Sequence, residues 1–367
     1  MLRSYGIHLT LYCKDIAIKV LSVLFNDFPS SMVRGIGRGH YAKKLGVDWV
    51  DLTYIPTEVI DRPFLIPKLN KNVVKSAEKR LAKKFDEFSK IIKNDVDVIY
   101  LINRPNPDLF EFLVTFEKPI VYDFDDPLYL SEFDTKATFK SDLYKYQGLT
   151  VDNKFALNEV KKYNEHVIFV DGITPVARTQ KALTKECVLI WIGSESTAMY
   201  VKPHIAILEK LLNKHENFKI ILLGVNSSHI DINSNKVKYV HTYNADDIVS
   251  YCQESDIGFY PVFDNTLGLH RGVHKLNIYF NCLIPVIAFD NTITAKTINN
   301  NNGFLFSNNN EFENSLNSFI SNIDLREKMK LYVDRKYGGH EQNIKSTNYL
   351  INFFQNIILN YNSKKLI

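Results

Sequence analysis

The chain has 367 residues, with 45 Lys and Arg against 41 Asp and Glu, so its formal net charge is only +4. Hydrophobic residues make up 45% of it and charged residues 23%, a composition that is typical of a globular protein and excludes global disorder. So small a positive charge argues against a dedicated nucleic-acid-binding protein, which needs a strongly basic face.

The four cysteines are Cys13, Cys187, Cys252 and Cys282. They lie far apart and form no C-x-x-C pair, which argues for a reducing compartment and against both a disulfide framework and a thiolate metal site. No stretch approaches the roughly 20 apolar residues that a membrane-spanning helix needs. We therefore expect a cytoplasmic protein that contacts a membrane, if at all, peripherally at its inner face.

Short β-branched segments alternate with helical ones along most of the chain. The segments that predict strands in the first half are 20–25, 98–102, 120–123 and 166–170. Those in the second half are 187–192, 218–223, 237–240, 257–260, 285–289 and 303–306. Several are apolar at every position, as parallel strands covered on both faces are. Strands separated by helices predict βαβ units, and therefore an α/β protein with doubly wound parallel sheets.

Both halves of the chain show this alternation, so we predict two Rossmann-like domains. The join falls near residues 172–186, which gives an N-terminal domain over 1–180 and a C-terminal domain over 181–344. The last segment, 345–360, has apolar residues on one face at helical spacing. We expect the helix over 345–367 to pack back on the N-terminal domain.

A glycine-containing loop, with Gly35 and Gly37, follows the first predicted strand. Glycines between a strand and a helix let backbone N–H groups approach a phosphate or a sugar. His40 stands where the dinucleotide motif G-x-G-x-x-G needs its last glycine, so that motif is absent. Arg34 and Arg38 flank the loop and favour contact with an anion, whereas a plain turn is the alternative.

Residues 68–93 interrupt the alternation with nine Lys and Arg against three acids, a local excess of +6. Apolar residues fall at helical spacing in the same stretch. One interpretation is a helix packed on the core with a basic, solvated back. The other is a basic face that attracts anionic lipid headgroups or an anionic polymer.

The strand at 120–123 ends in the sequence V-Y-D-F-D-D, with carboxylates at Asp123, Asp125 and Asp126. Ligands of open α/β sheets bind at the carboxyl ends of strands. Asp123 and Asp125 match the D-x-D pattern that binds a metal and a diphosphate in GT-A glycosyltransferases. Asp125 or Asp126 is alternatively a hydroxyl-binding group or a catalytic base, and capping of the following segment is a third interpretation.

The segment W-I-G-S-E-S-T (191–197) predicts a strand end, a turn and the start of a helix that runs to about residue 214. Gly193 and Ser194 are placed to offer backbone N–H groups to an anion. An ordinary capped turn between a strand and a helix explains the same residues equally well.

The segment L-H-R-G-V-H-K-L-N-I-Y-F (269–280) carries two cations and two histidines. Arg271 and Lys275 are four residues apart at a helix start, so they share one face beside the positive helix end and suit a diphosphate. His270 and His274 have the same spacing, but Arg271 replaces the Glu of the zinc motif H-E-x-x-H and disfavours a metal. We predict no metal and keep both histidines as candidate substrate contacts.

Together these motifs resemble the bacterial GT-B nucleotide-sugar glycosyltransferases, of the broad group around retaining families 4 and 1. The matching pieces are the glycine loop, V-Y-D-F-D-D, W-I-G-S, D-I-G-x-Y-P (256–261) and H-K-L-x-x-Y-x-x-x-x-x-P-V-I (274–287). They occur in the expected order across most of the chain. The resemblance implies two Rossmann-like domains facing a cleft, with a nucleotide-sugar donor such as a UDP- or GDP-sugar, no cofactor, and retention of anomeric configuration.

The resemblance also implies roles for individual residues. Lys275 and Arg271 would neutralise the leaving diphosphate, and Gly193 and Ser194 would contact it from the facing loop. Gly35 and Gly37 would approach the donor. Asp125 or Asp126 would lie near the acceptor. Many relatives carry a Glu shortly after the Lys, and the candidate positions here are Asn277, Ile278 and Tyr279. Of these, Asn277 and Tyr279 are polar and are predicted substrate contacts.

The leading prediction is therefore a transferase that adds a sugar to a glycan, a lipid-linked acceptor or a surface polysaccharide. The missing Glu keeps open a non-catalytic GT-B subunit that binds glycan or a partner transferase. A GT-B sugar-nucleotide epimerase is a third hypothesis, and it would need several acidic and histidine side chains converging on the sugar.

Overall fold

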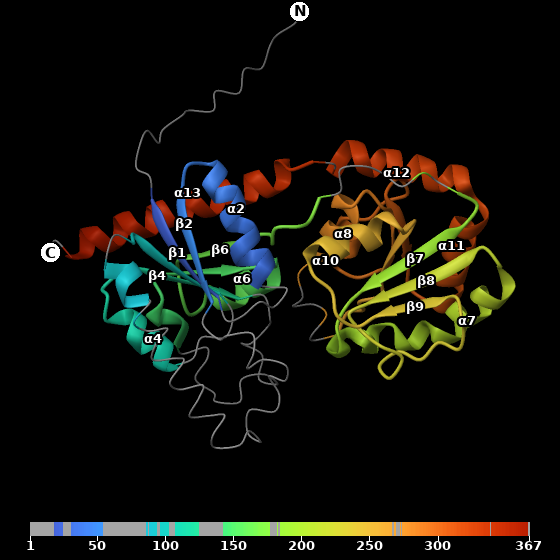
Figure 1. Ribbon diagram of the computed structural model, residues 1–367, viewed down its shortest axis with the longest axis horizontal. Helices are drawn as coiled ribbons and strands as arrows, with labels where there is room; N and C mark the ends of the chain where they lie inside the picture. The colour runs from blue at the N-terminus through green and yellow to red at the C-terminus, as the bar shows by residue number, and fades with distance from the viewer. Residues whose placement is uncertain are drawn as a thin grey trace, which may run out of the picture.

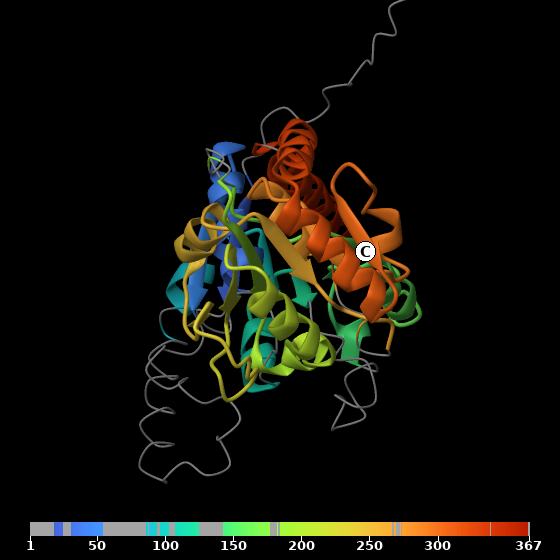
Figure 2. The same ribbon diagram turned by 90° about the vertical axis from the view of Figure 1, so that its right-hand side faces the viewer.

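The computed structural model describes residues 18–24, 31–53, 86, 88–93, 96–102, 107–124, 142–176, 182, 184–265, 268, 272, 274–337 and 339–365. Within these ranges the chain forms two six-stranded sheets, and the paired strands of both are parallel. The two sheets lie side by side in Figure 1, each with its own helices, and in the turned view of Figure 2 the second sheet lies in front of the first. The predicted α/β class with a doubly wound sheet in each half is confirmed.

The first sheet has the strand order β2-β1-β3-β4-β5-β6. Its strands are β1 (Lys19–Leu24), β2 (Asp48–Thr53), β3 (Val98–Ile102), β4 (Ile120–Phe124), β5 (Gly148–Val151) and β6 (Val167–Phe169). Its helices are the π-helix η1 (Met32–Ile36), α2 (Gly37–Lys44), α4 (Pro107–Val114), η4 (Leu143–Lys145) and α6 (Lys154–Val160). Every residue of β3 and β4 is buried, and both strands are apolar except at Asp123 of β4, as expected for parallel strands that are covered on both faces.

The second sheet has the strand order β12-β11-β10-β7-β8-β9. Its strands are β7 (Cys187–Ile192), β8 (Phe218–Leu223), β9 (Val237–Val240), β10 (Ile257–Tyr260), β11 (Val286–Phe289) and β12 (Gly303–Phe306). Its helices are η5 (Glu195–Tyr200), η6 (Lys202–His204), α7 (Ile205–Lys214), α8 (Ala245–Gln253), α10 (His274–Asn281), η7 (Thr294–Lys296), α11 (Asn309–Ser321) and α12 (Ile323–Tyr337). This is the strand order of a dinucleotide-binding fold, and the direction of winding reverses between β7 and β10.

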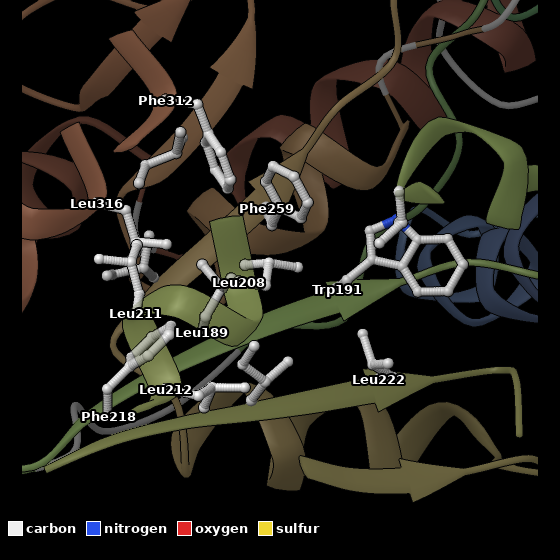
Figure 3. Close-up of a cluster of buried hydrophobic side chains, with 14 of the residues drawn as sticks. Leu189, Trp191, Leu208, Leu211, Leu212, Phe218, Leu222, Phe259, Phe312 and Leu316 are labelled. Atoms are coloured by element: carbon white, nitrogen blue, oxygen red, sulfur yellow. The ribbon is translucent and has the colours of Figure 1, made fainter. Parts of the chain in front are cut away.

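Apolar side chains fill both faces of the second sheet. On one face, β7 and β8 pack against α7 and α11, and Figure 3 shows Leu208, Leu211 and Leu212 of α7 facing this cluster. On the other face, the strands pack against α8 and α10. Trp191 lies at one end of the first cluster in Figure 3, where β7 approaches its carboxyl end. The core thus extends to the edge of the sheet at which ligands of such folds bind.

The last helix returns to the first sheet. The chain leaves the second sheet after α12 and forms α13 (Glu341–Lys365), which lies along the first sheet in Figure 1. Leu350, Ile351, Phe354 and Ile357 of α13 are buried against residues of β1, β3 and β4. The helix starts four residues before the predicted 345, and Tyr349 on the predicted apolar face is 53% exposed.

Two strands of the first sheet have no counterpart among the sequence predictions. β2 lies at the edge of the sheet and has the sequence D-W-V-D-L-T, whose two carboxylates interrupt the apolar pattern. β5 has only four residues, G-L-T-V, and begins with glycine. Short or polar strands lack the local signal by which a buried strand is recognised.

The basic segment is described only at its end, where residue 86 and residues 88–93 are helical. Phe88 and Ile92 are buried in the core of the first sheet, while Lys90 and Lys93 are exposed. The rest of the predicted basic helix, 68–85, lies outside the described residues. Among the described residues, no helix is long and apolar enough to cross a membrane.

Candidate functional site

A cavity of about 150 Å³ opens at the carboxyl ends of β7 and β10, where the winding of the second sheet reverses. Trp191 and Ile192 form its wall at the end of β7, and Tyr260 forms it at the end of β10. Asp152, which follows β5 of the first sheet, completes the wall from the other half of the chain. Ligand sites of doubly wound sheets lie at this reversal point, so we take this cavity as the candidate site.

Lys275 brings a positive charge to the cavity. It is the second residue of α10, and its Nζ lies 6.0 Å from the centroid of the Trp191 ring. The N-terminal end of a helix carries a partial positive charge, which adds to that of the lysine. The combination favours a ligand with a phosphate group. Arg271, the predicted partner of Lys275, and His270 lie outside the described residues.

His274, the first residue of α10, also lines the cavity, but it is uncharged. Burial, followed by the positive charges of Arg34 and Lys275, lowers the pKa of His274 to about 3. Neither ring nitrogen is exposed, and neither has a hydrogen-bond partner within the described part of the chain. Among the described residues no group of three His, Cys, Asp or Glu side chains could hold a metal ion.

Tyr279 is a core residue that connects two strands which form the wall of the cavity. Its hydroxyl accepts a hydrogen bond from Ile192 N at 2.9 Å and donates one to Phe259 O at 3.2 Å, so it joins the ends of β7 and β10. Its ring lies over Gly258, where a Cβ atom would be 2.5 Å from the Tyr279 Cγ. The predicted substrate contact by Tyr279 therefore has no support, because the side chain is fully buried and its hydroxyl is already bonded.

The other two positions that follow Lys275 also keep away from this cavity. Asn277 lines a different cavity, of about 310 Å³, together with Asn281 and Tyr337. Ile278 is 3% exposed in the core. Neither position therefore supplies the carboxylate that the family resemblance leads one to expect, and the predicted ligand contact by Asn277 would have to form in the second cavity.

The backbone N–H groups in the turn after β7 were predicted to contact an anion, but they bond within the protein. The Gly193 N–H donates to Leu223 O at 2.9 Å, and the Ser194 N–H donates to Thr197 Oγ1 at 2.8 Å. Both donors are thus engaged in the fold, and the predicted offer of these N–H groups to an anion has no support. Glycine is required at 193 because a Cβ atom there would collide with the Trp191 indole.

The glycines of the predicted loop are helical. Gly35 lies in η1 and Gly37 begins α2, so the predicted loop does not form. A Cβ atom on Gly35 would be 3.1 Å from the Ile102 Cδ1 and would collide with Leu24, so Gly35 allows η1 to pack closely on β1 and β3. For Gly35, close packing replaces the predicted approach to a donor phosphate.

Arg34 and Arg38 are buried, with 2% and 0% of their surface exposed. Arg34 pairs with Asp123 through Nε and through Nη2, which lies 2.7 Å from Oδ2. Burial opposes the charge, but Asp123 outweighs it and raises the pKa of Arg34 well above its usual value. Arg38 donates from Nη1 to Ser346 Oγ at 3.2 Å and from Nη2 to the Asp171 carbonyl. The two arginines hold the first half together, so their predicted contact with a bound anion has no support.

Asp123 is likewise committed to the fold. Besides Arg34, it accepts hydrogen bonds from the hydroxyls of Tyr100 and Thr150, and it is fully buried. These partners leave no place for a metal ion on Asp123, which removes the D-x-D interpretation. Asp125 and Asp126 lie outside the described residues.

Asp152 is the site residue that the sequence analysis missed. It supplies the acidic side chain among the described residues that line the cavity. Its carboxylate lies where a Cβ atom on Gly272 would be, so it reaches the segment that leads into α10. An acid directly after a strand is a recognisable signal, but the strand here is β5, which the sequence did not predict.

The cavity thus has one cation, one neutral imidazole and one carboxylate among its described residues, with aromatic and apolar side chains between them. Lysine and the helix end can stabilise a developing negative charge on a phosphate. A carboxylate on the opposite half of the chain can bind a hydroxyl group. The set is suited to binding a molecule that has a phosphate at one end and hydroxyl groups at the other.

No family model matches the chain, and no curated protein is significantly similar to it in sequence. Several solved structures are similar in fold. A glycosyltransferase from Rickettsia africae ESF-5 is 15% identical, with 93% of this chain and 98% of that chain covered and a TM-score of 0.57. Anabaena HepE in complex with UDP and glucose is 13% identical, with 91% and 99% covered and a TM-score of 0.58. A putative UDP-N-acetylglucosamine 2-epimerase from Listeria monocytogenes is 12% identical, with 92% and 95% covered and a TM-score of 0.58.

These similarities extend over nearly the whole length of each chain at low sequence identity, so they establish the fold. Together with the two parallel sheets, they show that the chain has the GT-B architecture predicted from its motifs.

Proposed function

We propose that the protein is a glycosyltransferase that moves a sugar from a nucleotide sugar, such as a UDP- or GDP-sugar, to a hydroxyl group of a glycan or lipid-linked acceptor. The observation that carries the proposal is Lys275 at the positive end of α10, in a cavity at the reversal point of a dinucleotide-type sheet. It is supported by the solved structures of the same fold, one of which holds UDP and glucose.

In this reaction the bond between the anomeric carbon and the diphosphate breaks, and negative charge develops on the departing diphosphate. Lys275 and the N-terminal end of α10 would stabilise that charge without a metal. Asp152, on the other half of the chain, would bind the acceptor hydroxyl, the role that the sequence analysis gave to Asp125 or Asp126. We propose retention of configuration, in which the departing diphosphate oxygen takes the proton of the acceptor hydroxyl.

A second candidate is a non-catalytic GT-B subunit that binds a glycan or a partner transferase. The observation in its favour is the helix after Lys275, where Asn277 faces another cavity and Ile278 is buried, so no carboxylate reaches the candidate site from α10. A protein of this kind would keep the fold without turning over a nucleotide sugar.

The test is an assay of nucleotide release from a panel of UDP- and GDP-sugars by the full-length chain, with and without EDTA. Replacing Lys275 with Met should lower turnover about 100-fold or more, because a preorganised positive charge at the leaving group is lost. The matched control is Lys328→Met, on the exposed side of α12, which should retain wild-type turnover.

Each alternative predicts a different result of this assay. Turnover that is abolished by EDTA contradicts the metal-independent mechanism, and turnover that is unaffected by Lys275→Met contradicts the assigned role of the lysine. An epimerised nucleotide sugar without nucleotide release would indicate an epimerase. Failure of the wild type to bind any nucleotide would favour the non-catalytic subunit.

A further inference from the structure

The charge of Lys275 lies against an aromatic ring of the cavity wall. Its Nζ is 6.0 Å from the centroid of the Trp191 ring, and both residues line the cavity. The face of an aromatic ring carries a partial negative charge and attracts a cation at this distance, more strongly where water is excluded. Trp191 comes from the end of β7 and Lys275 from the start of α10, so the contact joins two elements that are distant in the sequence.

The Trp191 ring is fixed by its own packing. It is 3% exposed and belongs to the buried apolar cluster between the second sheet and α7, at one end of that cluster in Figure 3. Gly193 packs directly on the ring, because a Cβ atom at that position would collide with Cζ2 and Cη2 of the indole. A ring held in this way has little freedom to move, so the position of the lysine ammonium follows that of the ring.

A neutral ring is a suitable partner for a cation that binds phosphate. A free lysine side chain samples many rotamers, and ordering them when a ligand binds reduces the affinity. A carboxylate could order the lysine, but it would also cancel the positive charge. The indole attracts the ammonium group without a formal charge of its own, which leaves the full positive charge for an anionic ligand.

We infer that Trp191 is a positioning residue, which holds Lys275 Nζ in the cavity before the ligand arrives and thereby strengthens binding of the diphosphate. The inference rests on the proposed function and deepens it, because it assigns the preorganisation of the phosphate site to a residue outside α10. Trp191 acts through Lys275 and has no part in the bond changes. If Trp191 only fills the core, the two side chains are not coupled in ligand binding.

The first experiment is a double-mutant cycle, with binding of UDP and of GDP measured by isothermal titration calorimetry. Trp191→Leu should weaken binding of the preferred nucleotide about fivefold, because a partly desolvated contact between a cation and a ring is lost. In the Lys275→Met background the same substitution should change the affinity less than about twofold. Phe312→Leu is the matched control, since it removes a buried ring elsewhere in the same cluster and should bind like the wild type.

A second variant keeps the shape of the ring and decides the question if Trp191→Leu does not fold. The chain has two tryptophans, and the other one, Trp49, lies in the core of the first sheet. Trp49→Phe protein grown with 5-fluorotryptophan therefore carries the fluorinated ring at Trp191 alone. Fluorine withdraws electron density from the ring face, so the affinity should fall about twofold relative to Trp49→Phe protein with ordinary tryptophan.

A third measurement needs no nucleotide. The lysines are methylated with ¹³C-formaldehyde, which preserves their charge, and the NMR resonance of Lys275 is assigned by its loss in Lys275→Arg. This resonance should move downfield in Trp191→Leu, because the ring current of the indole is removed.

Three outcomes would overturn the inference. One is an affinity that is unchanged or higher in Trp191→Leu, and the second is an equal loss of affinity in the Lys275→Met background. The third is a Lys275 resonance that stays in place when the ring is removed. A wild type that binds no nucleotide would contradict the proposed function, while the NMR measurement would still decide whether the ring holds the lysine.

Discussion

Arg34 and Asp123 place opposite charges inside the first half of the molecule, at positions 89 residues apart in the sequence. Removing both charges from water is costly, and the cost is offset only where geometry and further hydrogen bonds satisfy both groups. The hydroxyls of Tyr100 and Thr150 provide those bonds to Asp123, and the Val170 carbonyl accepts from Arg34 Nη1 at 3.3 Å. The pair and its partners therefore join η1 to β3, β4 and β5 through buried hydrogen bonds.

The pair makes a prediction about stability. Asp123→Asn keeps the shape of the side chain but leaves the buried guanidinium of Arg34 without a counter-charge. We expect the free energy of unfolding to fall by about 3–5 kcal/mol, measured by urea denaturation. In the control, Asp142→Asn removes a carboxylate that is 43% exposed and lies 2.7 Å from Lys145, and the unfolding midpoint should stay unchanged. Equal effects of the two substitutions would contradict the structural role of Asp123.

For Asp123, the sequence predicted the position in the fold but not the chemical role. The D-F-D-D motif was correctly placed at the end of a strand, since Asp123 is in β4. Its chemical role was not predictable. The local sequence around a carboxylate at a strand end is the same whether the carboxylate faces a ligand or pairs with a buried arginine. Lys275 was placed beside a helix start, and the structure puts it in the cavity. Its function in catalysis stays a prediction.

At the scale of elements, β10 and α10 determine the geometry of the cavity. Gly258 in β10 lets the ring of Tyr279 in α10 lie flat on the strand, and the tyrosine hydroxyl then reaches Ile192 at the end of β7. The Tyr279 side chain thus fixes the end of β7 relative to the end of β10, and both ends form the wall of the cavity. Tyr279 belongs to α10, the helix that also carries Lys275. The position of the lysine depends on this close contact.

We predict that Gly258→Ala lowers the free energy of unfolding by about 1–3 kcal/mol, because an added methyl group displaces the Tyr279 ring from a closely packed core. Binding of a nucleoside diphosphate should weaken in parallel, since the walls of the cavity move. Urea denaturation and calorimetric titration with UDP and GDP measure the two effects. The double variant Gly258→Ala/Tyr279→Leu should be less destabilised than the sum of the single variants. Strict additivity would show that the ring is not the obstacle.

Elements with a strong hydrophobic pattern were predicted, and elements without one were not. β7 and β8 were recognised with their observed bounds because their sequences are apolar at every position except Lys219. The segment around Gly35 was predicted as a loop because its glycines stand between a strand and a helix, yet it forms η1. That helix packs so closely on β1 and β3 that a side chain at position 35 would collide with Leu24 and Ile102. Gly35 is therefore explained by packing between elements that are distant in sequence, and not by a loop.

At the scale of the whole molecule, the chain crosses between the two sheets twice, after β6 and after α12. The crossings meet at Thr174. Asn343 of α13 accepts from Thr174 N at 3.2 Å and donates to Thr174 O at 2.8 Å, and Asn281 of α10 donates to the Thr174 hydroxyl. Both crossings and α10 are therefore joined by hydrogen bonds at one buried residue.

This junction can be tested through Asn343→Ala, which leaves the N–H and C=O of Thr174 without their side-chain partner. We expect hydrogen exchange of the Thr174 amide to become at least tenfold faster. The free energy of unfolding should fall by about 1–3 kcal/mol. Asn360→Ala, on the exposed side of the same helix, is the control and should change neither quantity. Unaltered exchange at Thr174 would mean that other contacts hold the crossings together.

The sequence by itself determined the small positive charge, the alternation of strands and helices, the two parallel sheets and the amphipathic last helix. These features depend on local spacing of apolar residues, which a sequence displays directly. Only the tertiary structure decided which polar groups are available to a ligand. The N–H of Gly193 is taken by Leu223, the guanidinium of Arg34 is taken by Asp123, and Asp152 is carried to the start of α10. Each of these outcomes depends on a partner that is distant in sequence, and the composition and spacing of a motif do not reveal such a partner.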